Sequence, residues 1–565
     1  MIEMFINIER LKLPDDLSVR VELNFPAFEN DSIPASVVYQ FDLPEKANEQ
    51  TFRYANHVEI LGKFKEYDWR MNYGGIPLFT GKLVILSVSG GRFRCAATLR
   101  QLSTGFSDKN LTDFHFETEY LVPPGSGVTE AYRIPTIDYE LFSLPQMYLP
   151  NLYSSNPAWS GFVNRFPFTD SHSYSEAAIP CFRVFKIIEK VFNTENFGVD
   201  YDSSMTALVL NLFRSLLFFN NYTLDTVPNE SESGEVSTWP ASYYENRIYP
   251  ENHLPEVSVN TLLVALKQMY GCQTFIDNRS QMVQFLLLDD ILKSLWLDLS
   301  KCALTAPEIT INEPKAYLLK YNIDEYKTGI SGISEYITLS AAPRPWHVDQ
   351  LISVRAVNSY YKSERFEDVN DAGQTTSSIE WSRVGDNYRS VRTNPDLNTC
   401  EEVKVDACPV SMIDLNGTFY PYFTEGGVSV RFNPDASKVD KLIFFHRTGN
   451  NGTRGTSSDI AADGSTEQFI PSLKLDENYG LYAKVLKPWY EFIENANEYS
   501  FDLKVTLEDM LNIIPIFGYQ DVHVQSQMRR IRIKNQVYVP KQFTFELTHT
   551  QIKCQAKLLK DDRNK

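Results

Sequence analysis

The chain has 565 residues, of which 43% are hydrophobic and 22% are charged, so it holds enough apolar side chains for packed cores, and wholesale disorder is excluded. Its length predicts about three or four domains. The formal net charge of −18 excludes a protein that binds nucleic acid over most of its surface. Aromatic residues make up 13%, and such side chains suit half-buried pleated surfaces, which favours β-structure.

Seven cysteines are spread singly along the chain, and the sequence has no CxxC pair. This pattern argues against a disulfide framework and predicts assembly in a reducing cytoplasm. Residues 1–10 lack a basic stretch followed by an apolar one, so we expect no signal peptide. The most apolar stretch, 205–220, is too short for a membrane span and contains Asn211 and Arg214.

Residues 1–120 are predicted to form an N-terminal β-barrel-like domain. The segment 19–23 alternates apolar with charged side chains, as a half-buried strand does. Three further β-prone runs, 68–73, 76–86 and 92–99, are separated by glycine pairs that supply the positive φ angles of tight turns. These features predict a β-meander within a small barrel or sandwich.

Residues 121–255 are predicted to be an irregular insertion that contains one amphipathic helix. Apolar side chains fall on one stripe of the segment 182–192, and Gly198 is expected to take the left-handed conformation that ends the helix. The segment 228–253 is acidic and rich in Tyr and Ser, which predicts a loop.

Residues 256–345 are predicted to hold a helix, a hairpin and a second β-domain. The helical pattern covers 259–270, with Ser258 or Asn260 as the N-cap and Gly271 as the stop. The elements expected after this helix are strands at 273–276 and 282–287 and a short helix near Asp289 and Asp290.

Residues 346–500 are predicted to form a β-rich insertion domain, and residues 501–565 a C-terminal segment that returns to the β-domain. The hydrophilic stretch 360–410 is expected to be mobile, whereas the apolar run 442–445 predicts a strand. The fold class that follows is α+β and dominated by strands, with small β-barrel or sandwich domains, a few short amphipathic helices and long loop insertions. The elements expected near the C-terminus are a helix start at 506–510 and strands at 530–534 and 543–548.

Signatures of metal and hydrolase sites do not occur in the sequence: HExxH, GxSxG, the Walker loop and EF-hand spacing are all missing. The eight histidines stand singly, which is typical of structural or surface roles. The glycine-rich loop 449–455 lacks the ending of a phosphate loop and is predicted to be a hairpin tip. We therefore predict no catalytic, metal-binding or cofactor-binding residue. Acidic pairs that leave a glycosidase open as an alternative are Asp289-Asp290, Glu401-Glu402 and Asp561-Asp562.

One basic feature stands out in this acidic chain. Strand alternation would place Arg530, Arg532 and Lys534 on one face and Ile531 and Ile533 on the other. A solvated outer face is the simpler interpretation. The sharper hypothesis is a contact with an acidic neighbouring subunit, and direct DNA binding is the least favoured reading.

Three segments together resemble the tail hub proteins of phages, the group that includes the late control protein D and baseplate hub families. Segment 32–99, with its Phe79-Thr80-Gly81-Lys82-Leu83 hairpin motif, resembles the opening domain of tail proteins from phages and prophages of Bacteroidetes. Segment 259–288 is similar to the hub pattern of an amphipathic helix, a glycine stop and a hairpin. Segment 501–559 resembles the closing segment, a short helix followed by strands that return to the barrel.

This resemblance implies a pair of small β-barrels per subunit, arranged as a ring around the tail channel, in which a trimer matches a hexameric tube. It implies a structural, non-enzymatic role in the hub, baseplate or tail tip, with other tail proteins and further copies of the chain as partners. The protein would belong to the virion tail after assembly in the host cytoplasm, residues 30–100 and 500–560 would contribute to the ring, and DNA would pass without specific binding. The alternatives are a receptor-binding tail protein, a carbohydrate-binding or glycan-cleaving one, the equivalent subunit of a contractile injection system, and a cell-surface binding protein.

Overall fold

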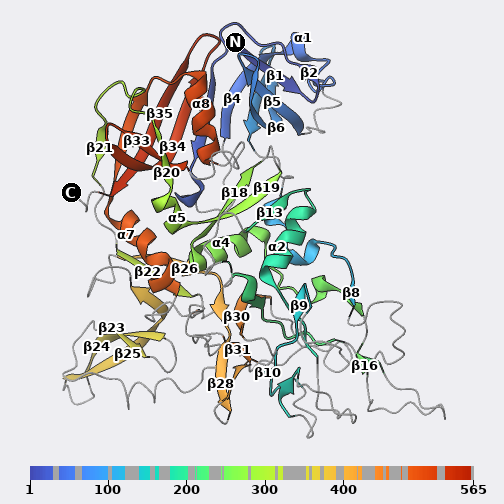
Figure 1. Ribbon diagram of the computed structural model, residues 1–565, viewed down its shortest axis with the longest axis vertical. Helices are drawn as coiled ribbons and strands as arrows, with labels where there is room; N and C mark the ends of the chain where they lie inside the picture. Colours follow the sequence, from blue (N-terminus) through green and yellow to red (C-terminus); the bar gives the residue numbers. More distant parts are fainter. Residues whose placement is uncertain are drawn as a thin grey trace, which may run out of the picture.

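The computed structural model of the chain shows a strand-dominated α+β fold, which confirms the fold class predicted from the sequence (Figure 1). None of the helices in the described part of the chain is long and apolar enough to cross a membrane. The described residues are 1–28, 37–57, 66–99, 105–120, 139–152, 160–164, 178–201, 210, 213–224, 226–227, 243–244, 247–277, 281–311, 316–321, 351–354, 359–369, 375–389, 400–415, 418–422, 440–448, 454–456, 473, 481–517 and 528–561.

A 13-stranded sheet joins the beginning and the end of the chain. Its strands follow the order β2-β1-β5-β6-β7-β4-β3-β34-β35-β32-β21, and β33 pairs with β34 on one side and with β20 on the other. The N-terminal and C-terminal strands meet where β3 lies antiparallel to β34, with Val19 opposite Leu547 (Figure 1). The bounds are β1 Ile2–Ile6, β2 Glu9–Arg10, β3 Val19–Asn24, β4 Val37–Pro44, β5 Tyr67–Tyr73, β6 Ile76–Ser89, β7 Arg92–Thr98, β20 Leu295–Asp298, β21 Glu308–Thr310, β32 Ala496–Leu503, β33 Met528–Ile533, β34 Gln536–Leu547 and β35 Ile552–Asp561.

The N-terminal strands form because apolar and polar side chains alternate along them. In β3 every second residue from Val19 to Leu23 is buried, as predicted. The glycine pairs at 74–75 and 90–91 link β5 to β6 and β6 to β7 with positive φ angles. These turns confirm the predicted β-meander, whereas β1 shows the same alternation but was not predicted.

The C-terminal part of the sheet is curled, and one connecting segment bonds to the strands at both of its ends. β20 lies parallel to β33 at one end of this part, and β21 lies antiparallel to β32 at the other. The connection between β20 and β21 bonds to both ends: the Leu299 amide donates to the Arg532 carbonyl at 2.9 Å, and the Leu304 amide donates to the Asp502 carbonyl at 3.1 Å. One short chain segment therefore bridges the two ends of the curled sheet.

Two hydrophobic cores fill the described part of the chain, and the β18–β19 hairpin contributes to both. Phe275 and Leu286 belong to the core under the large sheet. Val283, Phe285 and Leu287 belong to the second core, which surrounds α2 and α4. Because neighbouring residues of a strand face opposite sides, a hairpin buried on both faces can join two cores.

The helix before this hairpin matches its prediction. Its first residue is Val259, and the hydroxyl of Ser258 accepts from the Thr261 amide at 3.1 Å, so Ser258 and not Asn260 is the cap. Gly271 ends the helix with a φ of 61°. The elements of this region are α4 Val259–Tyr270, β18 Cys272–Asp277, β19 Met282–Leu287 and α5 Leu288–Lys293.

The helix α2 (Val184–Asn193) ends differently from its prediction. Asn196 takes the left-handed conformation with a φ of 61°, and Gly198 begins the strand β13 (Gly198–Asp200). A Cβ atom at Gly198 would lie 2.7 Å from the Sδ atom of Met282 on β19, so glycine allows the two strands to approach. The predicted stop at Gly198 was wrong because the glycine serves strand packing.

The stretch 360–410, whose mobility stays a prediction, contains long strands among its described residues. β24 (Ser359–Val369) and β25 (Thr375–Arg389) form a long antiparallel pair there. Long polar strands of this kind lack the apolar alternation from which strands are predicted.

The C-terminal elements follow the predicted order. The hydroxyl of Thr506 accepts from the Asp509 amide at 3.2 Å and caps α8 (Leu507–Ile513), which continues into the 3-10 turn η11 (Ile514–Phe517). The strands predicted at 442–445 and near the C-terminus correspond to β30, β33 and part of β34, whereas β35 was not predicted.

The remaining elements are short. They are η1 Pro26–Phe28, α1 Glu45–Asn48, η3 Phe106–Asp108, η4 Leu111–Asp113, β8 Glu119–Tyr120, β9 Phe142–Ser143, β10 Met147–Tyr148, β11 Phe162–Val163, β12 Cys181–Phe182, β14 Leu216–Phe218, β15 Thr226–Val227, β16 Tyr243–Tyr244, β17 Arg247–Ile248, η5 Pro250–Asn252, β22 Ala316–Tyr321, β23 Leu351–Val354, β26 Cys400–Val405, β27 Cys408–Pro409, β28 Ser411–Leu415, β29 Thr418–Tyr422, β30 Ile443–Thr448, β31 Arg454–Thr456, the π-helix η10 Tyr482–Leu486 and α7 Lys487–Asn495.

Candidate assembly surface

Exposed apolar side chains lie on the two outermost strands of the curled part of the sheet, β20 and β21. β20 contributes Leu295 and Trp296, and the residues in and around β21 contribute Leu304, Ile309 and Ile311. Ile311 is 80% exposed and Leu304 is 60% exposed. Among the described strands β20 pairs only with β33 and β21 only with β32, so each has an outer edge that another strand could use. We call these five residues the apolar edge.

The predicted basic strand face lies beside Trp296 of the apolar edge. Arg530 and Arg532 lie on one face of β33, and their guanidinium carbons are 5.7 Å and 5.9 Å from the centre of the Trp296 ring. These cation–π contacts hold the three side chains together. The Nε of Arg530 also donates to the Ser294 carbonyl at 2.7 Å, and burial lowers the pKa of Arg530. The sequence analysis missed Trp296, which joins the basic face to the apolar edge.

Lys534 does not lie on this strand face. β33 ends at Ile533, and Lys534 and Asn535 form the turn into β34 with φ angles of 47° and 66°. Two consecutive positive φ angles are the geometry of a tight hairpin turn. The alternation predicted through Lys534 was therefore wrong at its last residue, and the role of the basic face as a subunit contact stays a prediction.

The positive charge of this face has one carboxylate nearby: Asp298 lies opposite Arg532 in the β20–β33 pair, and hydrogen bonds from Ser300, and after them the charge of Arg532, lower the pKa of Asp298. Neither Arg530 nor Arg532 forms an ion pair with a carboxylate within the described part of the chain, although Lys541 pairs with Glu498 at 2.6 Å in the same sheet. In a chain with a net charge of −18, such a basic face suits an acidic partner surface.

Arg529, the neighbour of this face in sequence, points into the protein and was missed by the sequence analysis. It is 2% exposed, and its Nη1 donates to the carbonyls of Pro515 and Ile516 at 2.8 Å and 2.9 Å. Its guanidinium carbon lies 4.7 Å from the centre of the Phe275 ring, and burial lowers its pKa to about 10. Arg529 therefore connects β33 to η11 through hydrogen bonds and to β18 through its contact with Phe275. Strand alternation could have found it, because it shares a face with Ile531.

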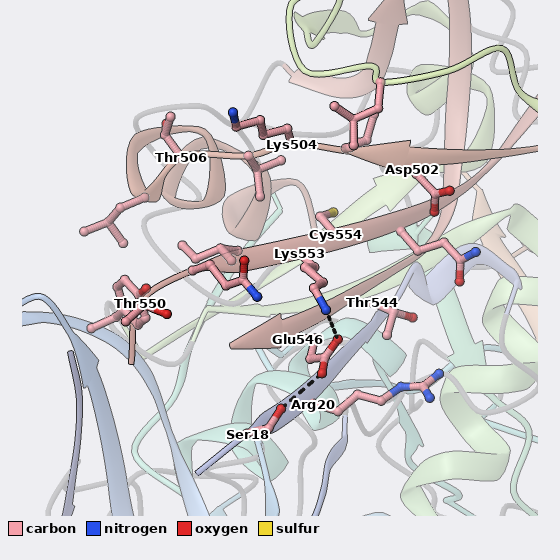
Figure 2. A pocket seen from close by; sticks show the side chains of 18 of the residues that line it. Ser18, Arg20, Asp502, Lys504, Thr506, Thr544, Glu546, Thr550, Lys553 and Cys554 are labelled. Atoms are coloured by element: carbon pink, nitrogen blue, oxygen red, sulfur yellow. Dashed lines mark hydrogen bonds and ion pairs between the residues drawn. The ribbon is translucent and has the colours of Figure 1, made fainter. Parts of the chain in front are cut away.

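A groove of about 1040 Å³ lies over β3, β34 and β35 beside α8 (Figure 2). Glu546 accepts a hydrogen bond from the Ser18 hydroxyl at 3.3 Å and lies 3.6 Å from the Nζ of Lys553. Among the described residues that line the groove, the one aromatic residue is Tyr73, which is 9% exposed. The described lining of the groove therefore offers no exposed aromatic ring.

One pair of Ser and His side chains lies in the second core. The Oγ of Ser215 and the Nδ1 of His446 are 2.9 Å apart, and His446 is 2% exposed. Burial lowers the pKa of His446 to about 3, so the ring is neutral at physiological pH. A nucleophile and its base must be reached by a substrate, and in this pair His446 is buried while Ser215 is half-buried.

The other chemical candidates from the sequence find structural explanations or lie outside the described residues. Asp289 forms an ion pair with Lys293, one turn further along α5. β30 and β31 flank the loop 449–455 as an antiparallel pair, as a hairpin tip requires, although 449–453 lie outside the described residues. Within the described residues, no group of three or more His, Cys, Asp or Glu side chains could hold a metal ion. Glu401 and Glu402 lie in β26, Asp561 ends β35, and Asp562 lies outside the described residues.

We expect the variant Asp290→Asn to be more stable than the wild type at neutral pH. Burial, and after it the charge of Asp289, raises the pKa of Asp290. When the pKa of a carboxyl is higher in the folded than in the unfolded state, the carboxyl does not reduce the free energy of unfolding below its unfolded-state pKa. The free energy of unfolding then falls as the pH rises through the folded-state pKa. The gain from the amide should be larger at pH 7 than near pH 3. Urea unfolding of both proteins at the two pH values measures this, and an equal difference at both would contradict it.

Comparisons with known proteins add the following findings. No protein-family model matches the chain, and no curated protein matches it. A tail protein from Neisseria meningitidis MC58 aligns over 99% of this chain and 96% of its own, with 9% identity and a TM-score of 0.33. The 43 kDa tail protein of prophage MuSo2 from Shewanella oneidensis aligns over 99% and 98%, with 8% identity and a TM-score of 0.33.

A third solved structure is a component of the E. coli type VI secretion system, described as similar in structure to the T4 bacteriophage tail proteins gp27 and gp5. It aligns over 98% of this chain and 76% of its own, with 8% identity and a TM-score of 0.26. TM-scores in this range do not establish a shared fold.

Proposed function

We propose that the chain is a structural, non-enzymatic subunit of a bacteriophage tail, located in the hub or baseplate and assembled as a ring around the DNA channel. The resemblance of segments 32–99, 259–288 and 501–559 to tail hub proteins supports this function. The observation that carries it is the apolar edge on a curled β-sheet. Exposed apolar side chains grouped along strand edges are typical of surfaces that another subunit covers.

The charge of the chain fits a channel wall. With a net charge of −18, the protein repels the phosphate backbone over most of its surface, so DNA could slide past without being held. The partners in this proposal are further copies of the chain, in a trimer, and other tail proteins. The chain would reside in the virion tail after assembly in the host cytoplasm.

Antibody labelling of particles tests the proposed location. We expect antibodies against this chain to label one end of the tail when particles of the phage or prophage that encodes it are imaged by electron microscopy. Antibodies against a host cytoplasmic protein serve as the control. Particles without label would contradict membership of the tail, and label along the whole tube would contradict a hub or baseplate position.

We expect Ile309→Asp to weaken self-association at least about 30-fold, because the contact would have to bury a carboxylate without a counter-charge, at a cost of at least about 2 kcal/mol. The matched control is Ile76→Asp in β6, since Ile76 is 40% exposed, close to the 52% of Ile309, but does not belong to the apolar edge. Light scattering over a concentration series measures both variants. Equal association of the two variants would contradict the role of the apolar edge.

A further inference from the structure

The large sheet contains the same arrangement of strands twice. Neighbouring strands follow the order β1-β5-β6-β7-β4-β3 in its N-terminal part and β20-β33-β34-β35-β32-β21 in its C-terminal part. A helix lies between β4 and β5 (α1) and between β32 and β33 (α8). Corresponding pairs are antiparallel in both parts, apart from the first, where β1 is antiparallel to β5 but β20 is parallel to β33. We call these two sets of strands the N-unit and the C-unit.

The pairing registers of the two units match residue by residue. They can be compared by following facing residues from β3 to β4 and β7, then four residues back along β7, and then across to β6. The same route in the C-unit leads from β21 through β32 and β35 to β34. The residues met in turn are Val21, Val38, Ala97, Phe93 and Val88 in the N-unit, and Ile309, Tyr499, Leu558, Cys554 and Phe545 in the C-unit. Ile309 therefore corresponds to Val21, and Val88 corresponds to Phe545.

One strand pair joins the two units within the chain. β3 of the N-unit lies antiparallel to the segment 542–547 of β34 in the C-unit, and Val21 lies opposite Phe545. This segment follows the register shift at Lys541, on the edge of β34 that β33 occupies only as far as Tyr538. Val21 and Phe545 are both fully buried. The junction therefore covers the outer edge of β3 with the half of β34 that β33 leaves open.

The corresponding surfaces at the other ends of the two units are open in the described part of the chain. The counterpart of β3 is β21, which pairs there only with β32 and whose three residues are all exposed. The counterpart of 542–547 is the segment 87–89 of β6, which follows the register shift at Leu86 and lies beyond the end of β5. Among the described strands only β7 pairs with this segment. Each unit thus lacks one half of the junction that the chain forms once.

We infer that β21 of one copy pairs antiparallel with the segment 87–89 of β6 in a second copy, and so repeats the junction of β3 with β34. The inference rests on the proposed ring and names the strands that join its subunits. A second copy fits the β21 edge because its N-unit presents the counterpart of the segment that β3 uses. In this pair Ile309 lies opposite Val88, as Val21 lies opposite Phe545.

The exposure of Ile309 agrees with this contact. Ile309 lies opposite Tyr499, which belongs to the core under the sheet, and facing residues of an antiparallel pair share one side of the sheet. Ile309 is nevertheless 52% exposed, whereas its counterpart Val21 is fully buried. Val88 packs against the same core and is only partly buried. Pairing of the two copies therefore extends this core across the contact and removes Ile309 from water.

The positions of the two strands make the contact an intermolecular one. In Figure 1 β21 and β6 lie on opposite sides of the upper part of the molecule. A single copy therefore presents one surface to each of two neighbours. Contacts between unlike surfaces generate a ring when the rotation closes and a filament when it does not.

The inferred register places Thr310 opposite Ser87, next to the pair of Ile309 and Val88. Their counterparts within the chain are Glu22 and Thr544, which lie opposite one another. The Cβ atoms of facing residues in an antiparallel pair are about 4.5 to 5.5 Å apart, so cysteines at such positions can be joined by a disulfide. Thr310 is exposed and Ser87 is half-buried, so both substitutions leave the core intact.

Cysteine cross-linking of co-expressed variants tests the contact. Ser87→Cys and Thr310→Cys are made separately in a Cys400→Ser background, because the other cysteines, 95, 181, 272, 302, 408 and 554, are buried. Each variant carries a different tag, and each is oxidised alone and after co-expression with the other. We expect a cross-linked dimer carrying both tags from the co-expressed pair and no dimer from either variant alone.

Two controls sharpen this experiment. The double variant Glu22→Cys with Thr544→Cys has the corresponding pair within one chain and should lose both added thiols on oxidation without forming a dimer. Co-expression of Thr310→Cys with Thr80→Cys, in the part of β6 that pairs with β5, should give no cross-link.

The possible failures are distinguishable. A dimer from Thr310→Cys alone would overturn the inference in favour of a two-fold contact between β21 strands. An assembly by light scattering without a cross-link in the co-expressed pair, while the pair within one chain is oxidised, would overturn the assigned strands and leave the proposed ring intact. A monomer at every concentration would overturn self-association and this contact with it, while antibody labelling would still decide whether the chain belongs to a tail.

Discussion

The variant Gly81→Ala is expected to lose at least about 3 kcal/mol of folding free energy. A Cβ atom at Gly81 would lie 1.8 Å from the carbonyl oxygen and 2.9 Å from the carbonyl carbon of Thr98. Both atoms belong to the backbone and cannot rotate away, so the ladder between β6 and β7 would have to open. Glycine within a strand commonly marks such a close approach. Losses of this size come from disrupted packing or pairing in a core.

The matched control for this variant is Gly90→Ala. Gly90 has a φ of 59° in the turn between β6 and β7, but an added Cβ atom would meet nothing within 4 Å. Its loss should be only about 1 kcal/mol, the usual cost of a left-handed alanine. Urea unfolding followed by circular dichroism measures both variants, and equal midpoints for the two would contradict the close approach. The close approach of Gly81 to the backbone of Thr98 also explains why a glycine occupies the middle of the motif from Phe79 to Leu83.

The variant Arg529→Ala is expected to lose about 3 kcal/mol. Without the guanidinium, the carbonyls of Pro515 and Ile516 lose their donors in a buried place, at about 1 to 3 kcal/mol for each unsatisfied group. The void over Phe275 adds to this loss. Relief of the buried charge offsets part of it, since two nitrogens of Arg529 have no hydrogen-bond partner in the described structure.

Arg532→Ala is the matched control for this variant, because it removes the same side chain from the outward face of the same strand. We expect its unfolding midpoint to stay within about 0.5 kcal/mol of the wild type. Arg529→Lys should fall between the two, since an ammonium keeps the charge but not the planar contact with Phe275. An Arg529→Ala protein as stable as the wild type would show that the buried charge costs as much as its contacts contribute.

Local signals in the sequence predicted much of the fold. The cap at Ser258 and the stop at Gly271 placed α4, because both act within one turn of the helix. Alternation placed β3, and glycine pairs placed the hairpins of the N-terminal part. These features depend on neighbours in the chain, so the sequence displays them directly.

The candidate assembly surface depends on contacts that the sequence does not display. Trp296 and Arg530 are 234 positions apart, and they meet only because β20 pairs with β33 in parallel. The outward exposure of Ile309 follows from the position of β21 as the last strand of the sheet. The alternation of apolar and charged residues predicted the shared face of Arg530 and Arg532. The strand ends before Lys534 because the turn into β34 begins there.

The mass of the wild-type protein in solution, measured by light scattering at several concentrations, tests the ring most directly. The account predicts a closed trimer with three times the chain mass of 64.9 kDa, unchanged on dilution over the range in which the contact holds. A monomer at every concentration, or a filament that grows without limit, would contradict it.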